Sequence, residues 1–202
     1  MNIIRTLLLA LSLAACGSGT SETQAAPAPK RQEVAVFAGG CFWCTESDFE
    51  KVPGVLSAVS GFTGGRLNKP SYEQVSAGGT GHYEAVRITF DPTRVSYATL
   101  VRHYFRTVDP LDAGGQFCDR GETYRTAIFA VGAAQRAQAE KAKAEAARVL
   151  GKPIVTQILP AGNFWFAEAY HQDYYKKNPI RYNFYRSRCG RDSRLKEVWG
   201  GK

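Results

Sequence analysis

The feature that most constrains this chain is the octapeptide at residues 39–46, Gly-Gly-Cys-Phe-Trp-Cys-Thr-Glu. The apolar run before it, residues 34–38, predicts a short buried strand, and residues 45–51 after it predict the first turns of a helix. Cys41 is therefore predicted where a strand ends and a helix begins. Backbone N–H groups and the positive end of the helix near its sulfur favour thiolate over thiol.

Cys44 follows Cys41 by one helical turn and is predicted on the same side of the helix. Two cysteines at this spacing can close a disulfide on each other. The alternatives are an inert buried pair or half of a zinc site. A zinc site of four cysteines needs a second closely spaced pair, whereas Cys118 and Cys189 stand singly. The spacing favours redox chemistry and no bound metal.

The N-terminus resembles an export signal. Arg5 precedes an apolar run at residues 6–15 that is too short to span a bilayer. The run ends in Leu-Ala-Ala-Cys, which is similar to the cleavage box of bacterial lipoproteins, so we expect lipidation of Cys16. The alternatives are ordinary cleavage that leaves a free Cys16 thiol, or later cleavage near residues 25–26.

The domain organisation follows from this signal. Residues 1–16 are predicted to be a lipoprotein signal peptide with its lipobox, and residues 17–32, rich in Ser, Gly, Ala and Pro, a flexible tether. Residues 33–202 are predicted to form one domain. We expect an exported, periplasmic protein held at a membrane by its lipid anchor.

The net charge is +8 over 202 residues. Because the charge is spread along the chain, it is typical of a basic globular protein and does not indicate a nucleic-acid partner. We expect a monomer that binds no nucleic acid.

Alternating strand and helix patterns predict an α+β fold, a two-layer sandwich with a mixed sheet, helices on one side and a ferredoxin-like core. Two Gly-rich loops interrupt the pattern, and the arginine-rich segment at the end of the chain is expected to be a solvated tail, in which Arg188 and Arg191 would lower the pKa of the Cys189 thiol. The predicted strands are 53–62, 82–90, 124–131 and 154–159; the further helices are 96–107 and 133–150; the loops are 63–81 and 109–122; and the tail is 181–194.

Glu84 stands out on the strand at 82–90. Alternation places its carboxylate on the same face as Val86, Ile88 and Phe90. A carboxylate on an inward face must be paired with a buried arginine, protonated, or functional.

A thiol, an inward acid and phenols occur on the predicted loops and strand face: Cys41, Glu84, Tyr72 and Tyr124. A thiolate beside a neutral carboxylic acid can attack a centre whose oxygen must be protonated before it leaves. A sulfoxide is such a centre. Phe42 and Trp43 would add an apolar wall for an S-methyl group.

These residues lie within segments that resemble the class A peptide methionine sulfoxide reductases, which act on the S epimer. The resemblance covers roughly residues 33–200. It is carried by Gly40-Cys41-Phe42-Trp43 followed by Glu46, and by Tyr72, Gly79-Thr80-Gly81-His82-Tyr83-Glu84-Ala85, Asp91-Pro92, Asp119-Arg120-Gly121, Tyr124-Arg125-Thr126-Ala127-Ile128 and Ala167-Glu168-Ala169-Tyr170-His171-Gln172-Asp173-Tyr174-Tyr175.

The resemblance implies a mechanism without a cofactor. Cys41 attacks the sulfoxide sulfur while Glu84 protonates the oxygen, methionine leaves, and Cys41 becomes a sulfenic acid. A second thiol condenses with it, and a thioredoxin-type reductant opens the disulfide. Asp119 would hold supporting hydrogen bonds. The implied substrates are free methionine sulfoxide and oxidised methionine in exported proteins and peptides, so the implied role is protein repair under oxidative stress.

The resolving thiol is where the chain departs from the family. Many members have Gly at the position of Cys44 and resolve through cysteines in a Gly-rich tail. Cys44, Cys118 and Cys189 are the candidates here. Cys44 is preferred because it requires no loop movement, whereas Cys118 and Cys189 would form a second disulfide that relays electrons or staples the tail.

Three rival functions remain at this point. A general periplasmic thiol–disulfide oxidoreductase would use Cys41 and Cys44 but would leave Glu84 unexplained. A hydrolase would activate Cys41 through His82 or His171. A lipid-anchored binding protein would use its cysteines only as staples.

Overall fold

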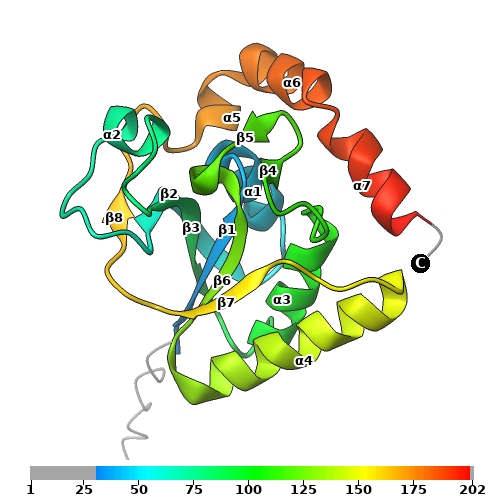
Figure 1. Ribbon diagram of the computed structural model, residues 1–202. Helices are drawn as coiled ribbons and strands as arrows, with labels where there is room; N and C mark the ends of the chain where they lie inside the picture. The colour runs from blue at the N-terminus through cyan, green and yellow to red at the C-terminus, as the bar shows by residue number, and fades with distance from the viewer. Residues whose placement is uncertain (1–30, 201–202) are drawn as a thin grey trace, which may run out of the picture.

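A mixed sheet forms the centre of the computed structural model, which describes residues 31–200 (Figure 1). The pairings are antiparallel except for β6 with β7, which is parallel. In order across the sheet, the six strands are β7 (Gln157–Pro160), β6 (Thr126–Ala130), β1 (Glu33–Gly39), β3 (Tyr83–Phe90), β2 (Val55–Thr63) and β8 (Trp165–Phe166).

The other elements surround this sheet. A short hairpin pairs β4 (Gly115–Gln116) with β5 (Asp119–Arg120), and a 3₁₀ turn, η1 (Glu122–Tyr124), follows it. The helices are α1 (Phe42–Glu50), α2 (Tyr72–Ser76), α3 (Tyr97–Arg106), α4 (Gly132–Leu150), α5 (Tyr174–Lys177), α6 (Pro179–Arg188) and α7 (Arg191–Trp199).

The main core lies between one face of the sheet and helices α1, α3 and α4. Phe37 and Ile88 from the sheet pack with Phe49 of α1 and Leu100 of α3, and all four are fully buried. Burial of each such side chain contributes about 1.5–3 kcal/mol. Ala139 lies on the buried side of α4, where its small side chain allows close packing.

The opposite face of the sheet has its own smaller cluster. Ala38, Ala85 and Phe129 are buried there, and Leu159 and Phe164 pack over them. β3 is therefore buried on both faces for most of its length, which explains why Tyr83 and Glu84 are both inaccessible although they point in opposite directions. The expected single α+β domain with a mixed sheet is confirmed.

Three segments differ from the sequence prediction. The loop predicted at 109–122 contains the β4–β5 hairpin. The loop predicted at 63–81 contains helix α2, for which Ser71 is the N-cap residue. The Ser71 hydroxyl accepts the Gln74 N–H, and the Gln74 side-chain oxygen accepts the Ser71 N–H. The arginine-rich segment is not a solvated tail but forms α6 and α7 along the outside of the domain (Figure 1). It docks because Arg191 is buried and donates to the carbonyl oxygens of Gly39 and Thr107.

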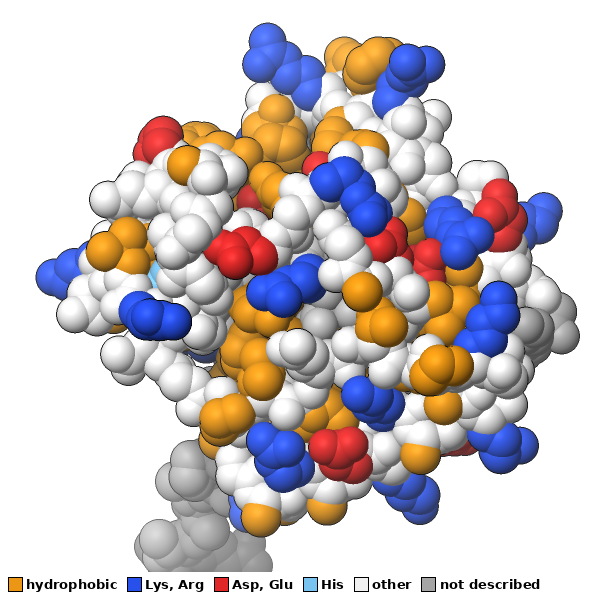
Figure 2. Space-filling model, in the orientation of Figure 1, with side chains coloured by type: hydrophobic (Ala, Val, Ile, Leu, Met, Phe, Trp, Pro, Cys, Tyr) orange, Lys and Arg blue, Asp and Glu red, His pale blue; other side chains and the backbone are white. Residues whose placement is uncertain are grey.

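Positive charge is dispersed over the face of the molecule that Figure 2 shows. In Figure 2, Lys and Arg side chains are scattered over the visible face among acidic and apolar ones. Among residues 31–200, no helix has the length and apolar character needed to cross a bilayer. The predicted lipidation site Cys16 and residues 17–30 of the predicted tether lie outside the described residues.

Candidate active site

Cys41 lies at the junction predicted from the sequence. β1 ends at Gly39, and Cys41 is the N-cap residue of α1. Gly40 makes the sharp turn between them with φ of +79°, and a Cβ on it would lie 2.5 Å from the Cβ of Gln116, so only glycine fits there. The turn buries the Cys41 side chain, which is 6% exposed.

Glu84 reaches this junction from β3. Its Oε2 accepts the backbone N–H of Phe42 at 2.9 Å, so it binds the first turn of α1 instead of pairing with a buried arginine. Burial raises the pKa of Glu84 to about 8, and the negative charge of Asp119 acts in the same direction. Glu84 is therefore a neutral acid at pH 7 and can donate its proton.

A small cavity of about 70 Å³ opens beside these two side chains. Every catalytic and substrate-binding residue predicted from the sequence lines it, together with Tyr185, which the sequence analysis did not single out. The lining residues are Cys41, Phe42, Trp43, Tyr72, Glu84, Asp119, Tyr124 and Tyr185.

The phenols of the cavity are hydrogen-bond donors at neutral pH. Burial raises the pKa values of Tyr72 and Tyr124, and the charge of Glu84 would raise them further. The Tyr185 hydroxyl donates to Oδ2 of Asp119. Burial raises the pKa of Asp119, while the bond from Tyr185 acts in the opposite direction.

Rings hold the apolar wall of the cavity in place. Trp43 donates its ring N–H to Nδ1 of His171 at 3.0 Å and stacks on Tyr174 with ring centroids 3.7 Å apart. Phe42 is buried against Phe62, with centroids 5.8 Å apart, and against His171. The wall is therefore fixed before a ligand arrives.

The Cys41–Cys44 pair is buried and reduced. Burial raises the pKa of Cys41, and its partner Cys44 raises it further. The hydrogen bond from Cys41 lowers the pKa of Cys44 to about 7, helped by the positive charges of Arg191 and Arg186. The resting thiolate therefore forms more readily on Cys44 than on Cys41, contrary to the expectation from the helix start, because burial disfavours the charged form of Cys41 while Cys44 accepts its hydrogen bond and lies near the arginines.

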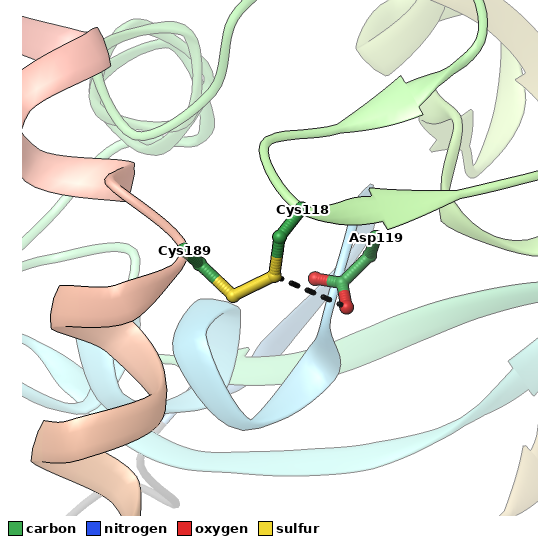
Figure 3. Close-up of side chains that lie close together, drawn as sticks. All are labelled: Cys118, Asp119 and Cys189. Carbon is green, nitrogen blue, oxygen red and sulfur yellow. Dashed lines mark hydrogen bonds between the residues drawn. A yellow bond between two sulfur atoms is a disulfide. The ribbon is translucent and has the colours of Figure 1, made fainter.

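The other two cysteines form a disulfide that joins the β4–β5 hairpin to the end of α6 (Figure 3). The Cys118 sulfur lies 3.9 Å from Oδ1 of Asp119, a contact in which a disulfide sulfur has no proton to donate. Cys118 is exposed and Cys189 is half-buried. The expected effect of neighbouring arginines on a Cys189 thiol does not apply here, and Arg191 acts on Cys44 instead.

Neither histidine suggested for a hydrolase is placed as its base. His82 uses one ring nitrogen on the carbonyl oxygen of Leu67 at 2.8 Å and the other on the Gly65 N–H. His171 accepts from Trp43 through Nδ1, and its Nε2 lies 4.0 Å from Glu168. Neither ring lines the cavity at Cys41.

Residues 33–202 match the family model of the peptide methionine sulfoxide reductases. This chain belongs to that family. It is 54% identical over 196 residues to peptide methionine sulfoxide reductase MsrA 2 of Caulobacter vibrioides, covering 96% of this chain and 97% of the relative.

Solved structures of reductases show the same fold. The methionine sulfoxide reductase A of Corynebacterium diphtheriae superposes with a TM-score of 0.71 at 34% identity, covering 76% of this chain and 78% of that one. Reduced Mxr1 of Saccharomyces cerevisiae gives 0.72 at 32% identity, covering 75% of this chain and 88% of that one. The protein is thus a peptide-methionine (S)-S-oxide reductase.

Two residues of this reductase were missed as parts of the site. Tyr185 belongs to the arginine-rich segment, for which the sequence predicts a solvated tail, and Arg191 acts on Cys44 rather than on Cys189. The sequence pattern that could have predicted a docked helix is the spacing of Tyr182 and Tyr185. Residues three apart lie on one face of a helix.

Proposed function

We propose that Cys41 carries out the sulfoxide reduction with Glu84 as its general acid. The observation that carries this assignment is the buried carboxyl of Glu84, which accepts the backbone N–H of Phe42, the residue next to Cys41, and whose pKa burial raises to about 8. A sulfoxide oxygen leaves only after it gains a proton, and a raised carboxyl pKa provides that proton at neutral pH.

The cavity supports a substrate that presents a methyl group and a sulfoxide oxygen. Phe42 and Trp43 would contact the S-methyl group, and the hydroxyls of Tyr72 and Tyr124 would donate to the oxygen. Its small volume suits the end of a methionine side chain rather than a whole residue, so both free and peptide-bound sulfoxides would enter. Asp119 would support this polar side.

The pKa order of the two thiols supports a specific proton path. Cys41 attacks the sulfur as its proton passes to the Cys44 thiolate, and Glu84 delivers its proton to the oxygen. Methionine and a Cys41 sulfenic acid result, with Cys44 now a thiol and Glu84 a carboxylate. One oxygen has moved from the substrate to Cys41, and both protons remain in the site.

Cys44 is the resolving cysteine in this proposal. Its sulfur is within hydrogen-bonding reach of Cys41, whereas Cys118 and Cys189 are bonded to each other. The Cys44 thiol displaces the hydroxyl of the sulfenic acid, which releases water and forms the Cys41–Cys44 disulfide. A thioredoxin-type dithiol then reduces this disulfide.

The cellular setting proposed from the N-terminal segment is repair of oxidised exported proteins by a periplasmic, membrane-anchored, monomeric lipoprotein. The support is the short apolar run that ends in Cys16. Expression of the full chain and its Cys16→Ala variant tests this, because only the wild type should carry acyl chains in the mass spectrum of its mature N-terminus. An unacylated wild type would leave the enzyme exported without an anchor or retained in the cytoplasm.

The scaffold of this site is inferred to be a ferredoxin-like core. Strands β1, β2, β3 and β6 alternate with α1 and α3 along the chain, and their order in the sheet, β6-β1-β3-β2, supports that assignment.

A single-turnover experiment tests the chemical assignment. The protein with reduced Cys41 and Cys44 is mixed with excess N-acetyl-methionine S-sulfoxide without reductant, and methionine is counted per enzyme. We expect about one methionine, a new Cys41–Cys44 disulfide by peptide mapping, and none with the R epimer. A wild-type enzyme that forms methionine but carries the new disulfide elsewhere would overturn Cys44 as the resolver.

A further inference from the structure

Two features lie against the site without a role in the proposed reaction. One is the Cys118–Cys189 disulfide, and the other is the hydroxyl of Tyr185. The two cysteines are 71 residues apart in the sequence, and both the disulfide and the Tyr185 hydroxyl contact Asp119.

Tyr185 contacts three walls of the cavity. Its hydroxyl donates to Asp119 and lies within hydrogen-bonding reach of the Cys41 sulfur. Its ring meets the ring of Trp43 edge-on, at 81° with centroids 5.9 Å apart. One side chain from α6 thus contacts the nucleophile, the apolar wall and the acidic wall.

The disulfide is next to both partners of this hydrogen bond. Cys118 directly precedes Asp119 on the hairpin (Figure 3). Cys189 is one helical turn after Tyr185, and its backbone N–H donates to the Tyr185 carbonyl oxygen at 2.9 Å. The covalent bond therefore fixes the distance between the backbone that carries the donor and the backbone that carries the acceptor.

The rest of the C-terminal segment is attached independently of the disulfide. Tyr182 is buried with Cys41 and Cys44, and Arg186 donates to Asp48 at 2.8 Å. Arg191 is buried against the main domain. The hairpin pairs only two residues in each strand, with Gln116 bonded to the backbone of Asp109 and Phe117 packed under the Arg191 guanidinium. Opening the disulfide should therefore loosen the turn at Cys118 and Asp119 locally and leave α6 and the rest of the hairpin docked.

We propose that the Cys118–Cys189 disulfide is a latch that holds the Tyr185 hydroxyl between Asp119 and the Cys41 sulfur, so that Tyr185 is a positioning residue for the Cys41 step. This proposal rests on the assignment of Cys41 as nucleophile. Because the Cys118 side chain is exposed, a reductant can open the latch without entering the cavity. Reduction of the Cys118–Cys189 disulfide to two thiols then slows the Cys41 step, although the reaction takes no electrons from these two cysteines.

The test measures the rate constant of the methionine burst in single-turnover mixing. The full chain is compared with Tyr185→Phe, with Cys118→Ser/Cys189→Ser and with the triple variant. We expect each of the first two to slow the burst about tenfold at saturating substrate, the loss expected for one hydrogen bond to a charged group. Because both changes act on the same contact, the triple variant should be no slower than either.

The matched control is Phe184→Ala, a neighbour on α6 that is 69% exposed, which should burst at the wild-type rate. A second arm needs no substitution and so does not depend on the folding of any variant. Wild-type protein in which Cys41 and Cys44 are reduced and the Cys118–Cys189 disulfide is intact should have a faster burst than wild-type protein in which all four cysteines are reduced. Both forms should yield about one methionine per enzyme and the Cys41–Cys44 disulfide.

Other outcomes would overturn the latch. Equal burst rates for the two wild-type forms and for the double variant would show that the disulfide does not act on the Cys41 step. If the double variant had the wild-type burst rate but could not sustain turnover with a thioredoxin-type reductant, the Cys118–Cys189 pair would instead be an electron relay. If the triple variant slowed the burst by the product of the two separate fold-changes, Tyr185 and the disulfide would act independently of each other. The absence of any wild-type burst would contradict the assignment of Cys41 itself.

Discussion

The two pairs of cysteines at Cys41/Cys44 and Cys118/Cys189 consist of the same side chains but differ in burial and oxidation state. Cys41 and Cys44 lie three residues apart at the start of one helix, buried and reduced. Cys118 and Cys189 join segments 71 residues apart at the surface and are oxidised. The buried pair has an acid, phenols and an apolar wall around it, whereas the surface pair contacts only Asp119 of that set. Surroundings rather than the thiols determine which pair can do catalysis.

Replacement of Cys41 tests this comparison most severely. Among the described residues, Cys41 is the only one with a sulfur that lines the cavity, so we expect no detectable methionine from the S-sulfoxide with Cys41→Ser. The measurement is product counting by chromatography, with the Cys118→Ser/Cys189→Ser protein as the matched change at the other pair. Methionine formation by the Cys41→Ser protein would show that the buried pair is not the nucleophilic one.

Replacement of Glu84 tests whether a neighbouring acid is what makes the Cys41–Cys44 pair, and not the surface pair, able to reduce a sulfoxide. Glu84→Gln keeps an amide of similar size that cannot transfer a proton, so the single-turnover rate should fall by about 10²–10⁴-fold. Thermal unfolding of the variant provides the control for folding. An unchanged rate would exclude Glu84 as the source of the proton.

The pH dependence should show two limbs in single turnover. Glu84 must be protonated, so activity should be lost as the pH rises through about 8, the pKa of Glu84. Cys44 must be a thiolate, so activity should be lost as the pH falls through about 7, the pKa of Cys44. Glu84→Gln should lack the alkaline limb and Cys44→Ser the acidic one. A flat profile between pH 6 and 9 in the wild type would contradict both assignments.

Replacement of Cys44 should separate reduction from recycling. Cys44→Ser should still form about one methionine per enzyme, more slowly because the proton acceptor is gone, and leave a Cys41 sulfenic acid that dimedone traps. Sustained turnover with a thioredoxin-type dithiol should be lost. If turnover continued at the wild-type rate, Cys118 or Cys189 would be the resolver.

Replacement of the surface pair should have its main equilibrium effect on stability. Cys118→Ser/Cys189→Ser should lower the free energy of unfolding by about 2–4 kcal/mol, because the cross-link no longer restricts the unfolded chain. Denaturant unfolding measures this, with Phe184→Ala expected to stay within about 0.5 kcal/mol of the wild type. A similar loss in Cys44→Ser would contradict the contrast between the pairs.

Much of this protein was predictable where the signal is local. The strand before Cys41, the alternation around Glu84 and the helix at 96–107 follow from periodicity in a few residues, and the structure has all three. The octapeptide also specified the turn, since Gly40 has a backbone conformation that other residues rarely adopt.

The C-terminal segment was not predictable in the same way. Its arginines suggested solvent exposure, but Arg191 is buried because carbonyl oxygens of Gly39 and Thr107, distant in sequence, converge on its guanidinium. Likewise, the pKa of Cys41 depends on its burial and the pKa of Cys44 depends in part on Arg191, and no local pattern contains either effect.

The sequence by itself determined the local geometry of Cys41, the inward position of Glu84 and the family, because these depend on adjacent residues and on ordered motifs. Only the tertiary structure decided between a resolving role for Cys118 or Cys189 and the disulfide that joins them, and showed that the Tyr185 hydroxyl bonds to Asp119 and that the thiolate forms more readily on Cys44. The physical reason is that bonds between distant segments and the desolvation of charge depend on which groups the folded chain brings together.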